Sequence, residues 1–366
     1  MNLEIKKALY LLLLILFLQG CDDDFITDVK ILVAYPDFQT GAAAIKKEQY
    51  EKAAKIYARI AETGNADAQN MLGRMYESGL GVDRDIDKAS MLYEKAAKQG
   101  HADAQNNLAL RVEKYGAYKY AASLYKKAIK QDHRRAKNNL GLLYEKGLGV
   151  EQDYQKAVAL FNEASKEGVW EATYNLGRMY QAGKGLPQNE QKAFKLYSEA
   201  SQHGVASAFG SMATMYLNGI GVKQDEEKAV ALYHKASNMG DAEATYNLAL
   251  LYMEDKGVNK DERKAIQYLK DASHMGYTQA RYRLAQIYEL QKNYKEAVRY
   301  YLPLAHDGYE KAPLKLAHLY KEGLGVEQDY KKAVKLYQKS IEQGYMEAQS
   351  DLDFLCNKQP WICKEN

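Results

Sequence analysis

The sequence predicts an all-α fold, an α/α solenoid (superhelix) of about nine helix-pair repeats. An apolar anchor residue recurs every 36 residues, and the spacing falls twice to 32. Each anchor lies in a helical pattern that is followed by a glycine-rich loop and a second helical pattern. Units of this length bury their apolar faces only against their neighbours, which is typical of a solenoid. The anchors are Leu72, Leu108, Leu140, Leu176, Met212, Leu248, Leu284, Leu316 and Leu352.

The unit from Trp170 to Gly204 illustrates one repeat. Its first part carries apolar residues at helical spacing around Leu176. Gly183, Gly185 and Pro187 then end the helix and turn the chain. Helical spacing resumes at residue 191 and ends before Gly204. Each repeat is therefore expected to contain a helix A, a glycine loop, a helix B and a short turn.

Small and large side chains occupy matching positions in the two helices. A helix A position directly after the anchor holds glycine or alanine, whereas one helix B position holds a large ring. This alternation lets helices interdigitate at high packing density. The large residues are Tyr93, Tyr125, Phe161, Tyr197, Tyr233, Tyr268 or Leu269, and Tyr337.

The pattern A-x-x-x-L-G-x-x-Y-x-x-G-x-G-V-x-x-D-x-x-K-A-x-x-L-Y-x-x-A resembles the Sel1-like repeat, a relative of the tetratricopeptide repeat. Good copies run over residues 136–165 and 312–340, and the loop motif recurs as 79–82, 147–150, 219–222 and 323–326. A degenerate first unit is expected near Phe38, so the repeats should cover residues 38–355. The resemblance implies a protein-binding surface and lowers the expectation of an enzyme.

The N-terminus has the features of an export signal. Lys6 and Lys7 precede an apolar run over residues 8–17, which is too short for a membrane span and suits a signal peptide. Residues 18–21, Leu-Gln-Gly-Cys, resemble a bacterial lipobox, which implies cleavage after Gly20 and lipid attachment at Cys21. We therefore expect a signal peptide over 1–20 and a tether over 21–37. The alternative is an ordinary signal peptide followed by an incidental cysteine.

The expected location is the bacterial cell envelope, with the chain lipid-anchored and facing the periplasm. Asp22 follows the lipidated cysteine, and in enteric bacteria an aspartate there resembles a signal for inner-membrane retention. A solvated spacer is the alternative reading. The sequence therefore favours the inner membrane and leaves the outer membrane open.

The tail over residues 356–366 holds the other two cysteines. An exported chain enters an oxidising compartment, where Cys356 and Cys363 can form a disulfide. Trp361 lies between them and is expected to cover the last repeat.

Composition and motifs argue against catalysis. The formal net charge is +3, with 27% charged residues and no basic run or motif typical of nucleic-acid binding. The glycine loops lack the strand and Lys-Ser/Thr of a phosphate loop. Of the seven histidines, four lie at or near turns between repeats and follow the repeat spacing, which is unlike metal-ligand spacing; they are His101, His133, His203 and His306. We therefore predict no enzyme, no metal, no cofactor, no small-molecule substrate and no nucleic acid, and membrane contact through the lipid anchor only.

A partner-binding row is expected on the concave face, which helix A lines in related solenoids. Residues two before and two after each anchor flank its buried stripe. Asparagines there can bond a peptide backbone, tyrosines can act as interface anchors, and arginines can bind carboxylates. Alternatively, the tyrosines pack between adjacent A helices and the arginines are solvated. The candidates are Asn70, Arg74, Asn106, Asn138, Tyr174, Arg178, Tyr246 and Tyr282.

Two functions from different classes fit these features. The first is a non-enzymatic scaffold or adaptor, anchored by lipid and facing the periplasm, that binds an envelope protein. The second is an immunity protein that neutralises a secreted antibacterial effector such as a phospholipase, because some lipoproteins with these repeats resemble such proteins. A cell-wall or lipid hydrolase is a third hypothesis without a catalytic residue set to support it.

Overall fold

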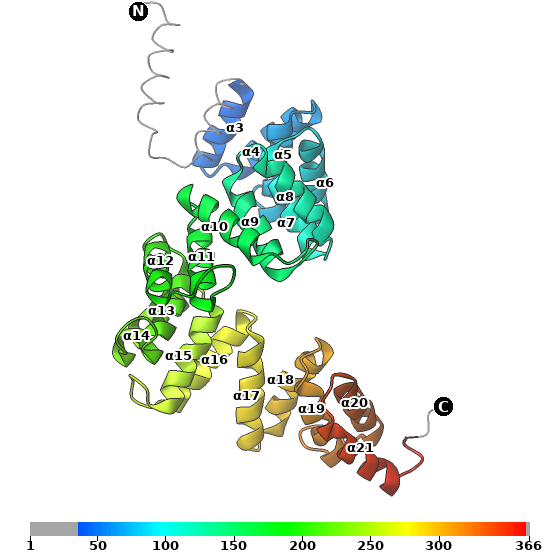
Figure 1. Ribbon diagram of the computed structural model, residues 1–366. Helices are drawn as coiled ribbons and strands as arrows, with labels where there is room; N and C mark the ends of the chain where they lie inside the picture. The colour runs from blue at the N-terminus through cyan, green and yellow to red at the C-terminus, as the bar shows by residue number, and fades with distance from the viewer. Residues whose placement is uncertain (1–35, 364–366) are drawn as a thin grey trace, which may run out of the picture. The chain divides into compact units, whose positions relative to one another are not determined.

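The computed structural model describes residues 36–363, which form nineteen helices, α3 to α21, and no strand (Figure 1). The helices alternate as A and B members of nine pairs, from α3–α4 to α19–α20, and α21 follows as a single helix. The predicted all-α repeat fold is confirmed. In the first half the bounds are α3 Pro36–Lys46, α4 Tyr50–Glu62, α5 Ala66–Ser78, α6 Ile86–Lys98, α7 Ala102–Lys114, α8 Tyr118–Ile129, α9 Arg134–Lys146 and α10 Tyr154–Lys166.

The second half continues the same alternation, and the last helix ends just before the tail. Its bounds are α11 Trp170–Ala182, α12 Glu190–Gln202, α13 Ala206–Asn218, α14 Glu226–Asn238, α15 Ala242–Glu254, α16 Glu262–His274, α17 Thr278–Leu290, α18 Tyr294–His306, α19 Ala312–Glu322, α20 Tyr330–Glu342 and α21 Glu347–Lys358. Within residues 36–363, no helix combines the length and the apolar character needed to cross a bilayer.

Several predictions from the N-terminus lie outside the described residues. These are the signal peptide over 1–20, the lipidation site Cys21, the retention signal at Asp22 and the tether up to residue 35. The last two tether residues begin α3. The helix pair expected near Phe38 is present as α3 and α4, and Phe38 is buried against Tyr57 with ring centroids 4.9 Å apart.

The chain divides into two compact units. The first contains residues up to 172 together with 184–186, and the second contains 173–183 and the residues from 187 onward. Each unit has its own buried clusters. In both, a B helix packs against its own A helix and against the next A helix, as α6 does with α5 and α7.

The predicted exchange of small and large side chains is observed in the packing. A Cβ atom on Gly141 would lie 2.7 Å from the Phe161 ring, and one on Gly177 would lie 2.7 Å from the Tyr197 ring. These glycines therefore make room for rings that are fully buried. Leu269 fills the slot that the sequence left open between Tyr268 and Leu269.

Several buried tyrosines also hydrogen-bond through their hydroxyl groups, whereas the buried Tyr337 hydroxyl has no hydrogen-bond partner within residues 36–363. The hydroxyl of Tyr125 donates to the Glu113 carboxylate at 2.8 Å, and that of Tyr301 donates to Glu289 at 2.8 Å. Burial is the main cause that raises the pKa of both phenols far above the usual range. Tyr125 and Tyr301 thus each join helix B to the end of its own helix A, as most buried hydroxyl groups form a hydrogen bond.

The two loop glycines have different roles. Gly147 ends α9 in the left-handed region, with φ +69, as expected for a helix C-cap. Gly149 also has a positive φ, but a Cβ atom there would lie within 2.5 Å of the Tyr118 carbonyl oxygen in the previous helix B. The first glycine therefore ends the helix, and the second allows the loop to touch the preceding repeat.

Asp255, which replaces the first loop glycine after α15, keeps the same geometry. It adopts φ 59, and its Oδ1 accepts a hydrogen bond from the Lys260 amide at 2.8 Å. Aspartate is one of the few side chains that tolerates this region because it can bond locally. The degenerate loop motif is therefore still a functioning C-cap.

Aspartate side chains cap most B helices. Oδ1 of Asp153 accepts from the Lys156 amide at 2.9 Å, and Asp85 and Asp329 bond Lys88 and Lys332 in the same way at 2.9 Å. These bonds to backbone amides are the largest cause that lowers the pKa of all three carboxyl groups. The ionised caps therefore stabilise the starts of three B helices.

The triple substitution Asp85→Asn, Asp153→Asn and Asp329→Asn should make the fold less sensitive to acid. Because the folded pKa is lowered, each cap stabilises the fold above the unfolded pKa of about 4 and loses this effect as the pH falls through the folded pKa. Asn189 caps α12 in the same position at 2.8 Å and does not titrate, so asparagine is a compatible replacement.

Thermal melts followed by circular dichroism between about pH 6 and pH 2 test this expectation. The wild-type midpoint should fall further with acid than the midpoint of the variant, while the two stay close at pH 6. An equal acid-induced loss in both proteins would show that the caps do not carry it.

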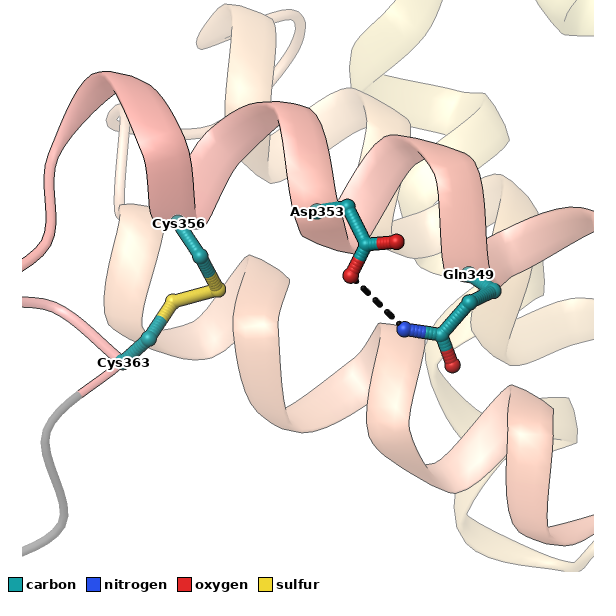
Figure 2. Close-up of a disulfide and its surroundings, with 4 residues drawn as sticks. All are labelled: Gln349, Asp353, Cys356 and Cys363. Atoms are coloured by element: carbon teal, nitrogen blue, oxygen red, sulfur yellow. Dashed lines mark hydrogen bonds between the residues drawn. A yellow bond between two sulfur atoms is a disulfide. The ribbon is translucent and has the colours of Figure 1, made fainter.

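The tail differs from the expectation in one residue. Cys356, at the end of α21, forms a disulfide with Cys363, which Figure 2 shows closing the tail onto the helix beside the Asp353–Gln349 hydrogen bond. The expectation that Trp361 covers the last repeat is wrong, since this side chain is 64% exposed. Ile362, the next residue, is buried in the last core cluster instead. The turn that contains it is closed by a hydrogen bond from the Ile362 amide to the Gln359 carbonyl oxygen.

Candidate functional site

The candidate site is the surface that successive A helices form within each unit, here called the helix-A surface. It contains the residues two before and two after each anchor. The row two before the anchors changes character along the chain, from asparagine in the first unit to tyrosine and glycine in the second. Its members are Asn70, Asn106, Asn138, Tyr174, Gly210, Tyr246, Tyr282, Leu314 and Ser350.

The sequence predicts that the three candidate asparagines are exposed, but all three are buried. Asn70 and Asn106 are each 5% exposed, and Asn138 is also buried. Nδ2 of Asn107 donates to Oδ1 of Asn70 at 3.0 Å, and Asn139 donates to Asn106 at 3.0 Å. The expected exposure of these amides is therefore corrected: those of Asn70 and Asn106 join neighbouring A helices, because the next repeat supplies a second asparagine directly before its anchor.

Arg111 adds an ion pair to this surface that the sequence did not reveal. It stands three residues after its anchor, where the other repeats carry an apolar residue, and its side chain is only 12% exposed. Its guanidinium bonds the Glu77 carboxylate, which also accepts from Tyr93 at 2.8 Å. Polar groups on the first unit's helix-A surface thus already bond one another.

The arginine candidates lie in different settings. Arg74 is exposed on α5, whereas Arg178 is half-buried on α11 and donates to Oδ1 of Asn175 at 3.3 Å. Arg178 stands beside Tyr174, whose pKa is raised chiefly by burial. Arg178 is therefore already bonded within its own helix, whereas the Arg74 side chain is open to solvent.

The tyrosine candidates are half-buried and lie against other rings. Tyr246 and Tyr277 have ring centroids 5.1 Å apart, and Tyr282 and Tyr309 are also 5.1 Å apart. Tyr174 contacts Tyr197 at 5.4 Å, and its hydroxyl accepts from Ser211 at 3.4 Å. The rings thus pack between helices and also leave part of their area open. We call Tyr246, Tyr277, Tyr282, Tyr309 and Tyr345 the tyrosine surface.

Tyr277 occupies a position that favours a capping residue. The equivalent residue Asp241 caps α15 through a bond to the Ala244 amide at 2.8 Å, whereas Tyr277 makes no side-chain cap on α17. A lost N-cap costs about 1 kcal/mol. Val205 also lacks a cap, and both residues pack against a core cluster instead. Tyr277 in addition pairs with the half-buried Tyr246, with ring centroids 5.1 Å apart.

Gly210 interrupts the row and opens a cavity of about 210 Å³ between α11, α13 and α15. This cavity was missed in the sequence because glycine also occurs in helix A at packing positions such as Gly177. It is lined by polar groups, among which are Tyr174, Arg178, Thr214, Asp241, Glu243 and Asn247.

A second, more open cleft of about 540 Å³ lies beside the short loop after α17. Leu290, the last residue of α17, is 83% exposed, and Nζ of Lys315 lies 3.6 Å from a Glu289 carboxylate oxygen within the cleft. The short loop leaves open the space that a full glycine loop fills elsewhere.

The histidines near the turns have structural roles. Nδ1 of His101 accepts from the Ala104 amide at 3.2 Å, and its Nε2 lies 3.0 Å from Oδ1 of Asp67 in the previous helix A. His133 caps α9 in the same manner and lies 3.1 Å from Asp103. Residues 36–363 contain no cluster of three or more His, Cys, Asp or Glu side chains that could hold a metal ion.

Comparison with known families gives a direct match. A model of the Sel1 repeat matches eight successive segments, which together cover most of the chain between residues 66 and 345. No curated protein matches the chain. The matched segments are 66–101, 102–133, 134–169, 170–205, 211–241, 242–277, 278–309 and 312–345.

Solved structures show related repeats. The chain is 29% identical to c5321, a protective antigen of uropathogenic Escherichia coli with an SLR fold, over 84% of this chain and 68% of that one, with a TM-score of 0.51. It is 26% identical to a Sel1 repeat protein from Oxalobacter formigenes, over 82% and 89%, with a TM-score of 0.56. The immunity protein Pa5087 from Pseudomonas aeruginosa is 24% identical over 59% and 86%, with a TM-score of 0.44.

The repeats matched by the family model are the helix pairs described above, with their anchors, loop glycines and buried rings in register. This chain therefore belongs to the Sel1 repeat family.

Proposed function

We propose that this protein is a non-enzymatic scaffold or adaptor that binds a protein partner through the tyrosine surface. Sel1 repeat folds support a role in protein interaction, and proteins of this family are generally non-enzymatic scaffolds. The observation that carries the proposal is the pairing of half-buried tyrosines across α15, α17 and α19, with rings 5.1 Å apart.

The arrangement of the rings suits an interface. Tyr282 contacts Tyr309 on one side and the buried Tyr301 on the other, so its ring is held in place before a partner arrives. A tyrosine loses little side-chain entropy on binding and offers both an apolar face and a hydroxyl group. Rigid aromatic anchors of this kind often dominate binding energy at protein interfaces.

The second unit is favoured over the first for the same reason. In the first unit, the amides of Asn70 and Asn106 bond neighbouring asparagines, and the Arg111 guanidinium bonds Glu77. A partner that used these groups would have to break internal hydrogen bonds, which offsets most of the gain. A partner that packs against the exposed faces of the tyrosine rings would not have to break internal hydrogen bonds.

Affinity capture with the full, tagged chain from its own cells, followed by mass spectrometry, tests the proposal. The double substitution Tyr246→Ala and Tyr282→Ala should lower the yield of the main partner by at least about 30-fold, since each interface anchor contributes about 2 kcal/mol. Tyr115→Ala is the matched control, because Tyr115 is a 72% exposed tyrosine of the first unit and is not a member of the tyrosine surface.

Circular dichroism separates binding from folding in this experiment. The double variant should keep the helical signal of the wild type. Full capture by a folded double variant would refute the tyrosine surface as the binding site. The identity of the partner decides between two roles: an envelope component indicates the scaffold, whereas a secreted antibacterial effector indicates the immunity protein that the sequence offers as the alternative.

We also propose that the protein is lipid-anchored in the bacterial cell envelope and faces the periplasm. The lipobox-like residues before Cys21 support this location. The disulfide between Cys356 and Cys363 supports it as well, because disulfides persist in oxidising compartments such as the periplasm. Asp22 favours the inner membrane within this proposal.

A further inference from the structure

The cavity at Gly210, here called the Gly210 notch, lies where a side chain is missing from the helix-A surface. The equivalent positions in the neighbouring repeats hold Tyr174 and Tyr246. A Cβ atom added to Gly210 would lie 3.4 Å from the Ala244 Cβ and 4.0 Å from Oδ2 of Asp241, which are ordinary contact distances. Unlike Gly177, which gives way to a ring, Gly210 is therefore not required by packing, and its effect is to leave an opening.

The size of the notch fits one side chain. Its volume of about 210 Å³ is smaller than the roughly 300–1,000 Å³ of typical small-molecule sites. Two walls are formed by Tyr174 on α11 and by the first turn of α15. A partner that lies along the tyrosine surface could place one side chain in this opening.

The lining selects a polar side chain. Hydroxyl and amide groups are supplied by Thr214, Asn247 and Ser211. The only aliphatic side chain in the lining is the methyl group of Ala244. The Thr214 hydroxyl lies 2.8 Å from the hydroxyl of Tyr233 on α14. This contact joins the floor of the notch to the B helix of the same repeat. The Ser211 hydroxyl donates to Tyr174 and the Thr214 hydroxyl to the Gly210 carbonyl oxygen. Both hydroxyl oxygens therefore offer acceptor capacity to a polar donor, which an apolar side chain could not use.

The charges favour a cation. Asp241 and Glu243 contribute two carboxylates, against one guanidinium from Arg178. Arg178 already donates to Asn175 at 3.3 Å. Asp241 uses one oxygen to cap α15, whereas the exposed Glu243 carboxylate makes no hydrogen bond or ion pair with another residue of the described range 36–363. The site thus has an excess of negative charge beside the ring of Tyr174.

We propose that the Gly210 notch binds a lysine or arginine side chain of the protein partner, which forms ion pairs with the carboxylates of Glu243 and Asp241. This inference rests on the proposed function, and it names a feature of the partner segment that reaches the helix-A surface. A charge-assisted hydrogen bond to a carboxylate is stronger than a neutral one. The Tyr174 ring adds a cation–π contact to a positively charged side chain.

Fluorescence polarisation with short labelled serine–alanine peptides tests the notch on the full chain. The peptides differ only in the central residue, which is arginine, lysine, norleucine or glutamate. The arginine and lysine peptides should bind at least about tenfold more tightly than the norleucine and glutamate peptides, a difference of about 1.4 kcal/mol. Gly210→Asn should remove this preference, because it restores the side chain that Asn70 carries in the first unit.

Further variants keep the test decisive. Gly210→Ala leaves most of the opening and should keep the preference. Glu243→Gln should reduce it, whereas Glu254→Gln, an exposed change at the other end of α15, should not. Equal affinity for all peptides, no binding up to about 1 mM, or a preference that persists in Gly210→Asn would each overturn the proposal.

The test is independent of partner capture. Tyr246→Ala with Tyr282→Ala should leave the preference for a basic peptide in place, because neither tyrosine lines the notch. If that double variant loses the partner while Gly210→Asn changes nothing, the notch proposal fails and the scaffold function stands. If the notch prefers basic peptides but capture does not depend on the tyrosines, the proposed binding surface fails instead.

Discussion

Replacing Gly149 with alanine should lower the stability of the fold by about 2–5 kcal/mol, more than the same change at Gly116. Both glycines have a positive φ, +67 at Gly149 and +79 at Gly116. At Gly116 an added Cβ atom meets nothing within 4 Å, so only the cost of the left-handed backbone remains, about 1–2 kcal/mol.

The larger effect at Gly149 follows from where its loop lies. The added Cβ atom would come within 2.5 Å of the Tyr118 carbonyl oxygen, in the first turn of α8. Backbone at the start of a packed helix cannot move aside as a flexible side chain can. Overpacking of this kind costs a further 1–3 kcal/mol or so, and it separates two adjoining repeats.

Urea unfolding followed by circular dichroism compares the two variants with the wild type. The midpoint of Gly149→Ala should lie well below that of Gly116→Ala. Because repeats can unfold in segments, a broadened transition in Gly149→Ala is also expected. An equal loss of stability in both variants would mean that the left-handed backbone alone accounts for the need for glycine at position 149. The close approach of this loop to the preceding repeat would then contribute nothing.

Replacing Cys21 with serine should abolish lipid attachment and release the protein from the membrane. Serine has no thiol to carry the thioether-linked lipid. Stable anchoring takes at least two acyl chains or an equivalent second signal, since one chain binds only reversibly. The apolar run over residues 8–17 is too short to replace the anchor by spanning the bilayer.

Metabolic labelling with an alkyne fatty acid, combined with fractionation, measures this effect. The wild type should carry the label and sediment with membranes, whereas Cys21→Ser should carry none and lose at least about tenfold of its membrane-bound fraction. Cys363→Ser is the control, because it removes a cysteine of the disulfide and should keep the label. A wild type without label, or a labelled Cys21→Ser, would contradict lipidation at this residue.

Much of the fold could be predicted because repetition makes local signals consistent. The anchor leucines, the loop glycines and the small helix A residues each recur at one position, and each has one local physical cause. Even the degenerate loop at Asp255 follows this rule, since its conformation is set within a few residues. The fold class and the order of helices therefore needed no long-range information.

The candidate site was predicted less well because exposure is decided between repeats. The register correctly placed Asn70 and Tyr246 at equivalent positions, but it did not show that Asn107 bonds the first and that Tyr277 packs beside the second. In the same way, glycine at position 177 accommodates a ring and glycine at 210 opens a cavity. The residue type was the same, and the facing helix made the difference.

The sequence by itself determined the repeat, its register, its loop chemistry and the candidate rows beside each anchor, since these depend on contacts within one unit. Only the tertiary structure decided which of those side chains are open to a partner, because that depends on what the next A helix supplies. In the tertiary structure the asparagines are buried between helices, whereas the tyrosines are half-buried. The missing side chain at Gly210 leaves the notch that is proposed to bind a basic side chain of the partner.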